Sequence, residues 1–227
     1  MPHHPTESLP EPDRDCPLCP RLNRFIAEQR LAHPDWHNAP VPTWYPPEGP
    51  GGVEFLIVGL APGLRGANRT GRPFTGDYAG NLLYGTLAKY GLSSGNFDAR
   101  PDDGLQLRRT AITNAVRCVP PQNKPVGAEI GTCRPFLSAT LAALTNLNVV
   151  LTLGRIAHET TVRAFGRRIS EHPFIHGGST KIDRVTIVSS YHCSRYNTNT
   201  GRLTEAMFDD VFRNISALLE EQVRAPT

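Results

Sequence analysis

Four short runs of apolar and β-branched residues recur along this chain, and they constrain its fold more than any other feature. They span residues 53–60, 110–116, 148–153 and 184–190. Stretches with helical periodicity lie between and after them, as at Leu83 and Leu87 and again at Phe208 and Phe212. Strands that alternate with helices favour a parallel sheet covered on both faces. The sequence therefore predicts an α/β fold, a three-layer α/β/α domain around a central four-stranded parallel sheet.

The length and composition are those of one globular domain. The chain has 227 residues, of which 39% are hydrophobic, and no apolar run approaches the roughly 20 residues needed to span a bilayer. Residues 1–15 are rich in Pro, His and acidic side chains and lack the apolar core of a signal peptide. We expect a flexible tail over residues 1–15, a single domain over residues 16–227, and a cytoplasmic, nucleoid-associated monomer. The net charge of +3 allows an anionic partner but does not argue for one.

Four of the five cysteines have a spacing typical of a metal centre. Cys16 and Cys19 form a Cys-x-x-Cys pair, and Cys118 and Cys133 follow much later in the chain. A reducing cytoplasm favours metal ligation over disulfides. Four thiolates bind either zinc or an iron–sulfur cluster, so the spacing alone leaves the metal open. Cys193 has no partner at a suitable spacing and is interpreted as a small local residue.

Every unusual polar cluster in the sequence follows the end of one of the four apolar runs. The clusters are residues 59–63 (Gly-Leu-Ala-Pro-Gly), 113–118 (Thr-Asn-Ala-Val-Arg-Cys), 154–155 (Gly-Arg) and 190–194 (Ser-Tyr-His-Cys-Ser). The carboxyl ends of parallel strands meet at one edge of a sheet, where open α/β sheets form their binding crevice. The sequence therefore predicts a single site at this edge.

The segment that follows the first cluster is basic and then carries a ring and a carboxylate. Residues 65–72 contain three arginines and two glycines but no acid, which indicates either a solvated basic loop or a phosphate site. Phe74 and Asp77 come next, just before a predicted helix. Asp77 either caps that helix or positions a water beside a base stacked on Phe74. The residues alone favour the cap.

Asn114 and His192 are the remaining polar candidates at the strand ends. Asn114 either satisfies local backbone or pairs with the edge of a base. His192 follows a strand and begins a turn-forming run, which favours an exposed role over core packing. His158, His172 and His176 are assigned no chemistry.

Together these motifs resemble those of the family 5, or B-type, uracil-DNA glycosylases. The resemblance rests on residues 59–62, 68–77 (Asn-Arg-Thr-Gly-Arg-Pro-Phe-Thr-Gly-Asp), 113–118 and 190–197. It extends from Cys16 to the last helix and implies the same four-stranded sheet. It also implies a [4Fe–4S] cluster held by Cys16, Cys19, Cys118 and Cys133. One position departs from the family pattern, since Cys193 stands where the family usually has a proline that stiffens the loop.

The resemblance implies an enzyme that hydrolyses the N-glycosidic bond of uracil in DNA, and of other deaminated bases such as hypoxanthine, leaving an abasic site. It assigns catalysis to Asp77, Asn114 and His192, with Asp77 activating the water. Base binding is implied for Phe74, for Asn114 and for the segment of Gly59, Leu60, Ala61, Pro62 and Gly63. Contacts with DNA are implied for Arg69, Arg72, Ser194, Arg195, Tyr196 and Asn197.

Two other functions use the same sequence features. A nucleic-acid-binding module without catalysis, whose fold is held together by a metal site, would need the same basic loop and cysteines. A nucleotide-binding oxidoreductase is disfavoured, because residues 59–63 lack the Gly-x-Gly-x-x-Gly of a dinucleotide turn. No lysine stands among the motif residues to form a Schiff base, so the glycosylase reading predicts a monofunctional enzyme without a lyase step.

Overall fold

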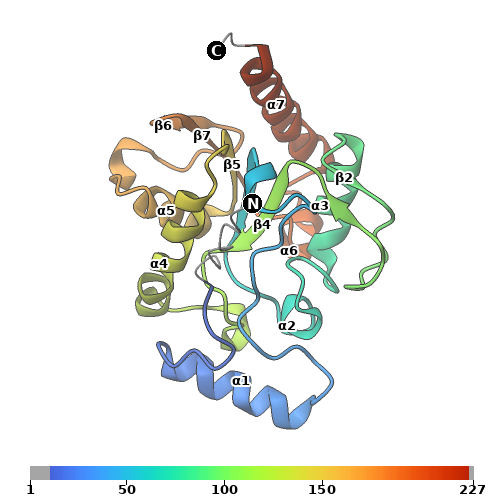
Figure 1. Cartoon of the computed structure of the whole chain (residues 1–227), viewed down its shortest axis with the longest axis vertical. Helices are drawn as coiled ribbons and strands as arrows, with labels where there is room; N and C mark the ends of the chain where they lie inside the picture. Colours follow the sequence, from blue (N-terminus) through green and yellow to red (C-terminus); the bar gives the residue numbers. More distant parts are fainter. Residues whose placement is uncertain (1–10, 225–227) are drawn as a thin grey trace, which may run out of the picture.

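A five-stranded sheet forms the centre of the computed structural model, which describes residues 11–224 and the side chains through residue 221 (Figure 1). The strand order is β4-β1-β5-β7-β6. The parallel strands are β4 (Thr110–Asn114), β1 (Phe55–Gly59), β5 (Val149–Leu153) and β7 (Val185–Ser190). All four lie within the apolar runs of the sequence, so the predicted parallel strands are confirmed.

The sheet has one strand more than the sequence predicted. β6 (Ser179–Ile182) pairs antiparallel with β7 and forms one edge of the sheet. Only Ile182 of its residues is buried, so the strand has no apolar run that would mark it in the sequence. The four-stranded prediction is therefore corrected to four parallel strands and one antiparallel edge strand.

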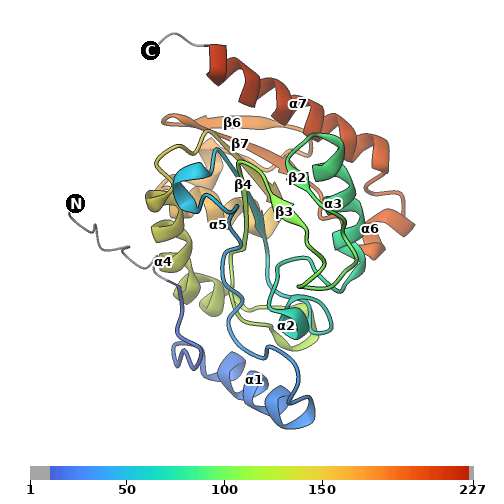
Figure 2. The same cartoon turned by 45° about the vertical axis from the view of Figure 1, so that its right-hand side comes forward.

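Helices cover both faces of the sheet, as predicted (Figures 1 and 2). α3 (Tyr78–Lys89) and α7 (Glu205–Arg224) pack on one face, and α4 (Gly127–Ala143) and α5 (Arg155–Ala164) pack on the other. Successive residues of β1 face opposite layers, since Phe55 and Ile57 join the first core and Leu56 and Val58 join the second. All four are fully buried, which places β1 at the centre of a three-layer α/β/α domain.

Short elements surround this core. α1 (Pro20–Ala32) lies at the end of the molecule opposite α7 in both views (Figures 1 and 2). α2 (Ala67–Thr70) follows β1, and α6 (Arg195–Asn199) follows β7. β2 (Ser93–Ser94) and β3 (Gln106–Leu107) form a separate ribbon, and 3-10 turns occur at Pro50–Gly52, Pro121–Asn123 and Ile169–Glu171. Within residues 11–224 no helix is both long and apolar enough to cross a membrane.

The N-terminal segment is held to the body of the fold by polar contacts. Arg21 of α1 forms a bidentate ion pair with Glu129 of α4, with both N···O distances at 2.7 Å. Glu11 accepts a hydrogen bond from the backbone N–H of Thr43 at 3.1 Å. Residues 11–15, predicted as part of a flexible tail, therefore include a specific contact. Residues 1–10 of that tail lie outside the described residues.

Candidate active site

A cavity of about 410 Å³, which we call the strand-end cavity, lies at the carboxyl ends of β1, β4 and β7. Its lining comprises Leu60, Ala61, Pro62, Gly63, Ala67, Phe74, Asp77, Tyr78, Ala79, Asn114, Asn123, His192, Ser194 and Arg195. Polar clusters that follow three different strands thus meet at one cavity, as the sequence predicted. The fourth cluster, residues 154–155, is not part of the lining.

Gly59 allows two side chains to approach the end of β1. A Cβ atom on Gly59 would lie 2.5 Å from Oδ1 of Asn114 and 2.7 Å from Cζ of Phe74. The register of the sheet explains the first contact, because Gly59 pairs with Asn114 across β1 and β4. The missing side chain therefore lets the amide and the ring come together beside the cavity. Among the described residues the Asn114 amide has no hydrogen-bond partner, so it is free to bind a ligand.

Phe74 adopts a backbone conformation that L-residues avoid. Its φ is 52°, in the left-handed region, which costs a bulky residue about 1–2 kcal/mol. The ring is buried, and its centroid lies 5.9 Å from that of the His192 ring at an interplanar angle of 28°. Such a conformation persists only where the surrounding contacts hold it.

A buried ion pair supplies contacts of this kind. Arg72 pairs bidentately with Asp103 at 2.8 and 2.7 Å, and its Nε donates to the hydroxyl of Thr75 at 2.7 Å. The guanidinium also lies 4.8 Å from the ring centroid of Trp44. The hydrogen bonds from Arg72 hold the pKa of the Asp103 carboxyl well below its usual range, so the pair stays ionised. Arg72 therefore anchors the residue directly after Phe74.

Asp77 has two oxygens with different surroundings. Oδ1 accepts a hydrogen bond from the N–H of Ala79 at 3.2 Å and caps α3, so the predicted cap is confirmed. Oδ2 faces Gly63 and Gly66, where Cβ atoms would lie only 3.0 and 2.4 Å away. Burial raises the pKa of the Asp77 carboxyl above its usual value, although hydrogen bonds from the α3 backbone oppose the shift. A carboxylate with a raised pKa and one uncommitted oxygen at a cavity is suited to accept a proton.

His192 lines the cavity as a neutral imidazole. Burial lowers the pKa of His192 to about 4, so at neutral pH the ring offers a hydrogen bond but no positive charge. The next residue, Cys193, is fully buried, and its thiol donates to the carbonyl of Ala79 at 3.5 Å. This weak bond ties the His192 loop to the first turn of α3. Packing of Cys193 thus restrains the loop at the position where the family usually has proline.

The short helix α6 presents two large side chains next to the cavity. The hydroxyl of Ser194 caps the helix by accepting from the N–H of Asn197 at 3.4 Å. The side-chain amide of Asn197 donates to the carbonyl of His192 at 2.8 Å. Arg195 and Tyr196 are exposed, and Tyr196 retains 72% of its accessible surface. These contacts fix the base of the loop, while Tyr196 projects into solvent and the guanidinium of Arg195 lies 5.1 Å from the ring centroid of Tyr78.

The four predicted ligand cysteines meet at one small apolar cavity, which we call the four-cysteine site. Cys19 immediately precedes α1, Cys118 follows β4, and Cys133 lies on α4. Burial and the neighbouring Cys133 raise the pKa of the Cys118 thiol to about 12. None of the described lining residues is acidic. A donor set of thiols alone in an apolar setting suits zinc or an iron–sulfur cluster, so the residues present fit such a group.

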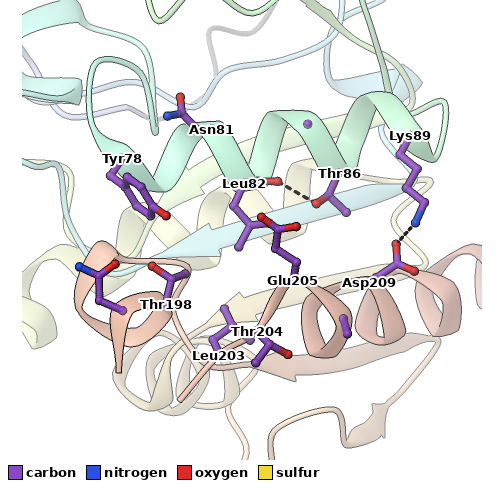
Figure 3. A pocket seen from close by; sticks show the side chains of 13 residues that line it. Tyr78, Asn81, Leu82, Thr86, Lys89, Thr198, Leu203, Thr204, Glu205 and Asp209 are labelled. Carbon is purple, nitrogen blue, oxygen red and sulfur yellow. Dashed lines mark hydrogen bonds and ion pairs between the residues drawn. The ribbon is translucent and has the colours of Figure 1, made fainter. Parts of the chain in front are cut away.

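A larger hollow of about 800 Å³ lies between α3 and the segment of α6 and α7, and we call it the α3–α7 groove (Figure 3). Lys89 and Asp209 form an ion pair at one end of it, and the Thr86 hydroxyl donates to the carbonyl of Leu82 (Figure 3). The ion pair with Lys89 lowers the pKa of the Asp209 carboxyl. Tyr78 lines both the groove and the strand-end cavity. The α3–α7 groove is roomy, but its lysine and one of its two carboxylates, Lys89 and Asp209, already pair with each other.

Comparison with known proteins assigns this arrangement to a family. Residues 46–216 match the family model of the uracil DNA glycosylase superfamily. The chain belongs to this superfamily. That membership confirms the fold predicted from the resemblance, apart from the extra edge strand.

Sequence similarity to individual relatives indicates which type of uracil-DNA glycosylase this chain resembles most. The type-5 uracil-DNA glycosylase of Thermus thermophilus is 42% identical over 210 residues, covering 89% of this chain and 93% of that protein. The type-5 enzyme of Pyrobaculum aerophilum is 35% identical over 207 residues, covering 89% and 88%. A type-4 uracil-DNA glycosylase of Sulfurisphaera tokodaii is 29% identical over 173 residues, covering 73% and 72%. The similarity to type-5 members is both higher and longer, which confirms the resemblance to family 5.

Several of the residues predicted to contact DNA in this superfamily member have partners within the protein. Arg72 is only 5% exposed and pairs with Asp103, so the prediction that it binds DNA is wrong. An arginine in a glycine-rich loop is expected to be solvated, because the sequence does not show that an acidic residue from a later segment will pair with it in the folded protein. Asn197 uses its amide to hold the His192 carbonyl. Arg69 is exposed, and its Nε donates to the carbonyl of Arg65 at 2.9 Å.

Sequence reasoning missed four residues that line the strand-end cavity of this superfamily member: Ala67, Tyr78, Ala79 and Asn123. Tyr78 directly follows Asp77 and could have been inferred from the start of the predicted helix. Asn123 lies in the 3-10 turn Pro121–Asn123 with a φ of 56°, a region that Asn tolerates better than most residues. No local signal in the sequence marks its approach to the cavity.

Proposed function

We propose that this superfamily member hydrolyses the bond between uracil and deoxyribose in DNA, releasing the free base and leaving an abasic site. The observation that carries the proposal is the convergence of three uncommitted groups on one cavity. They are Oδ2 of Asp77, the amide of Asn114 and the ring of Phe74. The names of the type-5 relatives support uracil as the base.

The base must first leave the duplex, which costs a few kcal/mol of stacking and pairing. Arg195 and Tyr196, exposed on α6 beside the strand-end cavity, have the bulk to fill the space that a flipped nucleotide vacates. Arg69 offers a further exposed cation to the DNA backbone. The proposal therefore gives the α6 segment the role of a wedge.

Inside the cavity the ring and the amide would hold the base. Phe74 offers an aromatic face for stacking, and its position is set by the Arg72–Asp103 pair. An asparagine side chain presents one acceptor oxygen and two N–H donors. These groups match the N3–H and the O4 of uracil. Asn114 is thus the candidate for base recognition.

In the chemical step the C1′–N1 bond breaks and its electron pair moves onto the uracil. A water oxygen forms the new bond to C1′, and Oδ2 of Asp77 accepts the water proton; such a base typically contributes about 10²–10⁴-fold. The neutral His192 ring and the backbone N–H groups of Ala61 and Gly63 can stabilise the charge that develops on the base. Both N–H groups have no acceptor within the part of the chain that the structure describes.

We further propose that Cys16, Cys19, Cys118 and Cys133 hold a [4Fe–4S] cluster. Four thiols line one apolar cavity, which is the donor set that binds such clusters, and the resemblance to family 5 favours the cluster over zinc. Hydrolysis moves no electrons, so the cluster would join α1, the segment after β4 and α4 without taking part in the reaction. Purified protein is expected to be brown and to contain iron and acid-labile sulfide. Colourless protein with one zinc per chain from an anaerobic preparation would overturn this assignment.

An excision assay tests the main proposal. A labelled duplex with one uracil is incubated with the protein and then treated with alkali, which cleaves abasic sites. Cleavage at the uracil and none in the matched thymine duplex is the expected result. Binding of the duplex without cleavage would instead support the non-catalytic module. Borohydride should trap no protein–DNA adduct, because the proposed mechanism uses water rather than an amine. A panel with hypoxanthine at fixed salt would define the range of bases.

A further inference from the structure

The loop before β6 lies beside the end of β7, next to the strand-end cavity. The N–H of Gly177 donates to the carbonyl of Ser189 at 2.8 Å, and the N–H of Tyr191 donates to Nδ1 of His176 at 3.1 Å. The first bond extends the β6–β7 pairing beyond the start of β6, and the second joins the loop to the residue directly after β7. Residues 174–176 therefore reach the carboxyl edge of the sheet, directly before His192.

Two arginines at this edge rest on aromatic rings. The guanidinium of Arg202 lies 4.8 Å from the ring centroid of Tyr191, and Tyr191 stacks on His176 at 4.6 Å with an interplanar angle of 8°. The guanidinium of Arg155 lies 5.3 Å from the ring centroid of Phe174. A cation–π contact holds a guanidinium in place without using its N–H donors. Both arginines are therefore positioned, with their donors still free.

Within the described part of the chain, the positive charges of the two arginines have no acidic partner. Arg155 and Arg202 are exposed, and neither has a hydrogen bond or an ion pair with any described residue. Glu159, one turn after Arg155 on α5, lies 4.0 Å from Arg163. Positioned guanidinium groups without a carboxylate partner are suited to bind phosphate.

The tip of the loop is apolar. Ile175 retains 60% of its accessible surface, between the rings of Phe174 and His176. DNA-binding proteins often insert such a side chain into the minor groove while cations on either side hold the phosphates. The two unpaired arginines beside it favour nucleic acid over an apolar protein surface as the partner.

We propose that Arg155, Phe174, Ile175, His176, Tyr191 and Arg202 form a second DNA-contact surface. Its arginines bind backbone phosphates of the duplex, and Ile175 enters the minor groove next to the flipped nucleotide. None of the six residues lines the strand-end cavity, so they act on flanking DNA and not on the base. This inference rests on the proposed function, because it takes damaged duplex DNA as the partner.

The test measures binding to a fluorescent duplex that carries a tetrahydrofuran abasic analogue, which cannot be hydrolysed. Each phosphate contact contributes a slope of about 0.9 to the fall of log K with log salt concentration. The double variant Arg155→Ala, Arg202→Ala should therefore lose about 1.8 from that slope. The control Arg167→Ala, Arg213→Ala removes the same charge from arginines already paired with Asp183 and with Asp209 and Asp210, and should leave the slope unchanged.

Further variants separate charge, apolar contact and folding. The double variant Arg155→Lys, Arg202→Lys keeps both positive charges and should keep the salt slope. A folding defect would instead weaken binding in the lysine and the alanine double variants alike. Ile175→Ser should weaken duplex binding, while Leu31→Ser, at a residue 88% exposed on α1, should not. An unchanged slope in the alanine pair would overturn the inference. Because the probe needs no catalysis, a wild-type protein that binds it but fails to excise uracil would overturn the proposed function alone.

Discussion

The strand-end cavity and the α3–α7 groove share helix α3 and the side chain of Tyr78, yet only one of them has the properties of a reactive site. The groove is the larger, about 800 Å³ against about 410 Å³. Its Lys89 and Asp209 neutralise each other. The cavity instead contains a carboxylate with a raised pKa and a histidine whose pKa falls to about 4. Uncommitted polar groups with shifted pKa values mark the site better than volume does.

Asp77→Asn should produce the largest difference between the two hollows. Asparagine caps a helix as well as aspartate does, so the free energy of unfolding should change little. It cannot accept a proton, and single-turnover excision should fall by about 10²–10⁴-fold. Asn81→Ala in the groove is the control and should keep the wild-type rate. Excision by Asp77→Asn at the wild-type rate would remove Asp77 from its proposed role.

A pair of glycine substitutions compares the two hollows sterically. Gly59→Ala would place a methyl group 2.5 Å from Asn114 and 2.7 Å from Phe74. A displacement of about 1 Å at a reacting centre costs about 10²-fold, so kcat/KM should fall by about that factor. Gly85→Ala lies in α3 on the groove, where a Cβ meets nothing within 4 Å. It should keep full activity and stabilise the protein by about 1 kcal/mol in urea unfolding. Equal activities of the two variants would contradict the comparison.

The two ion pairs should differ in their contribution to stability. Arg72→Ala leaves Asp103, whose side chain is 1% exposed, without its partner, and should lower the free energy of unfolding by about 3–5 kcal/mol. Lys89→Ala removes a partner that is 61% exposed and should leave the free energy of unfolding almost unchanged, because solvent screens exposed ion pairs. Urea unfolding measures both. A small loss for Arg72→Ala would show that the pair does not hold the Phe74 segment.

The pH dependence of kcat/KM on the acid side should be the smallest of these effects when it is measured near neutral pH. Asp77 must be ionised to accept a proton, so kcat/KM should fall as the pH drops through its pKa, which burial raises above the usual 3.8. His192 has a pKa of about 4 and stays neutral above that value, so its titration should not change kcat/KM near neutral pH. The residual activity of Asp77→Asn should not show this fall of kcat/KM at acid pH. If the variant still shows the fall, a group other than Asp77 is responsible for it.

The sequence predicted the four parallel strands because each is a continuous apolar run, and most of the cavity because its residues follow those runs directly. It did not predict what depends on contacts between distant segments. Arg72 looked solvated because Asp103 approaches it only in the folded chain. The loop at Phe174–His176 showed no role because β6, too polar to be recognised, carries it to the edge of the sheet. The four cysteines predicted a metal site, and the metal itself stays a prediction.

A crystal structure of the Asp77→Asn variant with a uracil-containing duplex tests the central claim most directly. The variant keeps the helix cap and slows hydrolysis, so the substrate should remain intact. We expect the uracil in the strand-end cavity, with its face on Phe74 and its polar edge at Asn114. A uracil that stays stacked in the duplex, or that lies in the α3–α7 groove, would contradict the account.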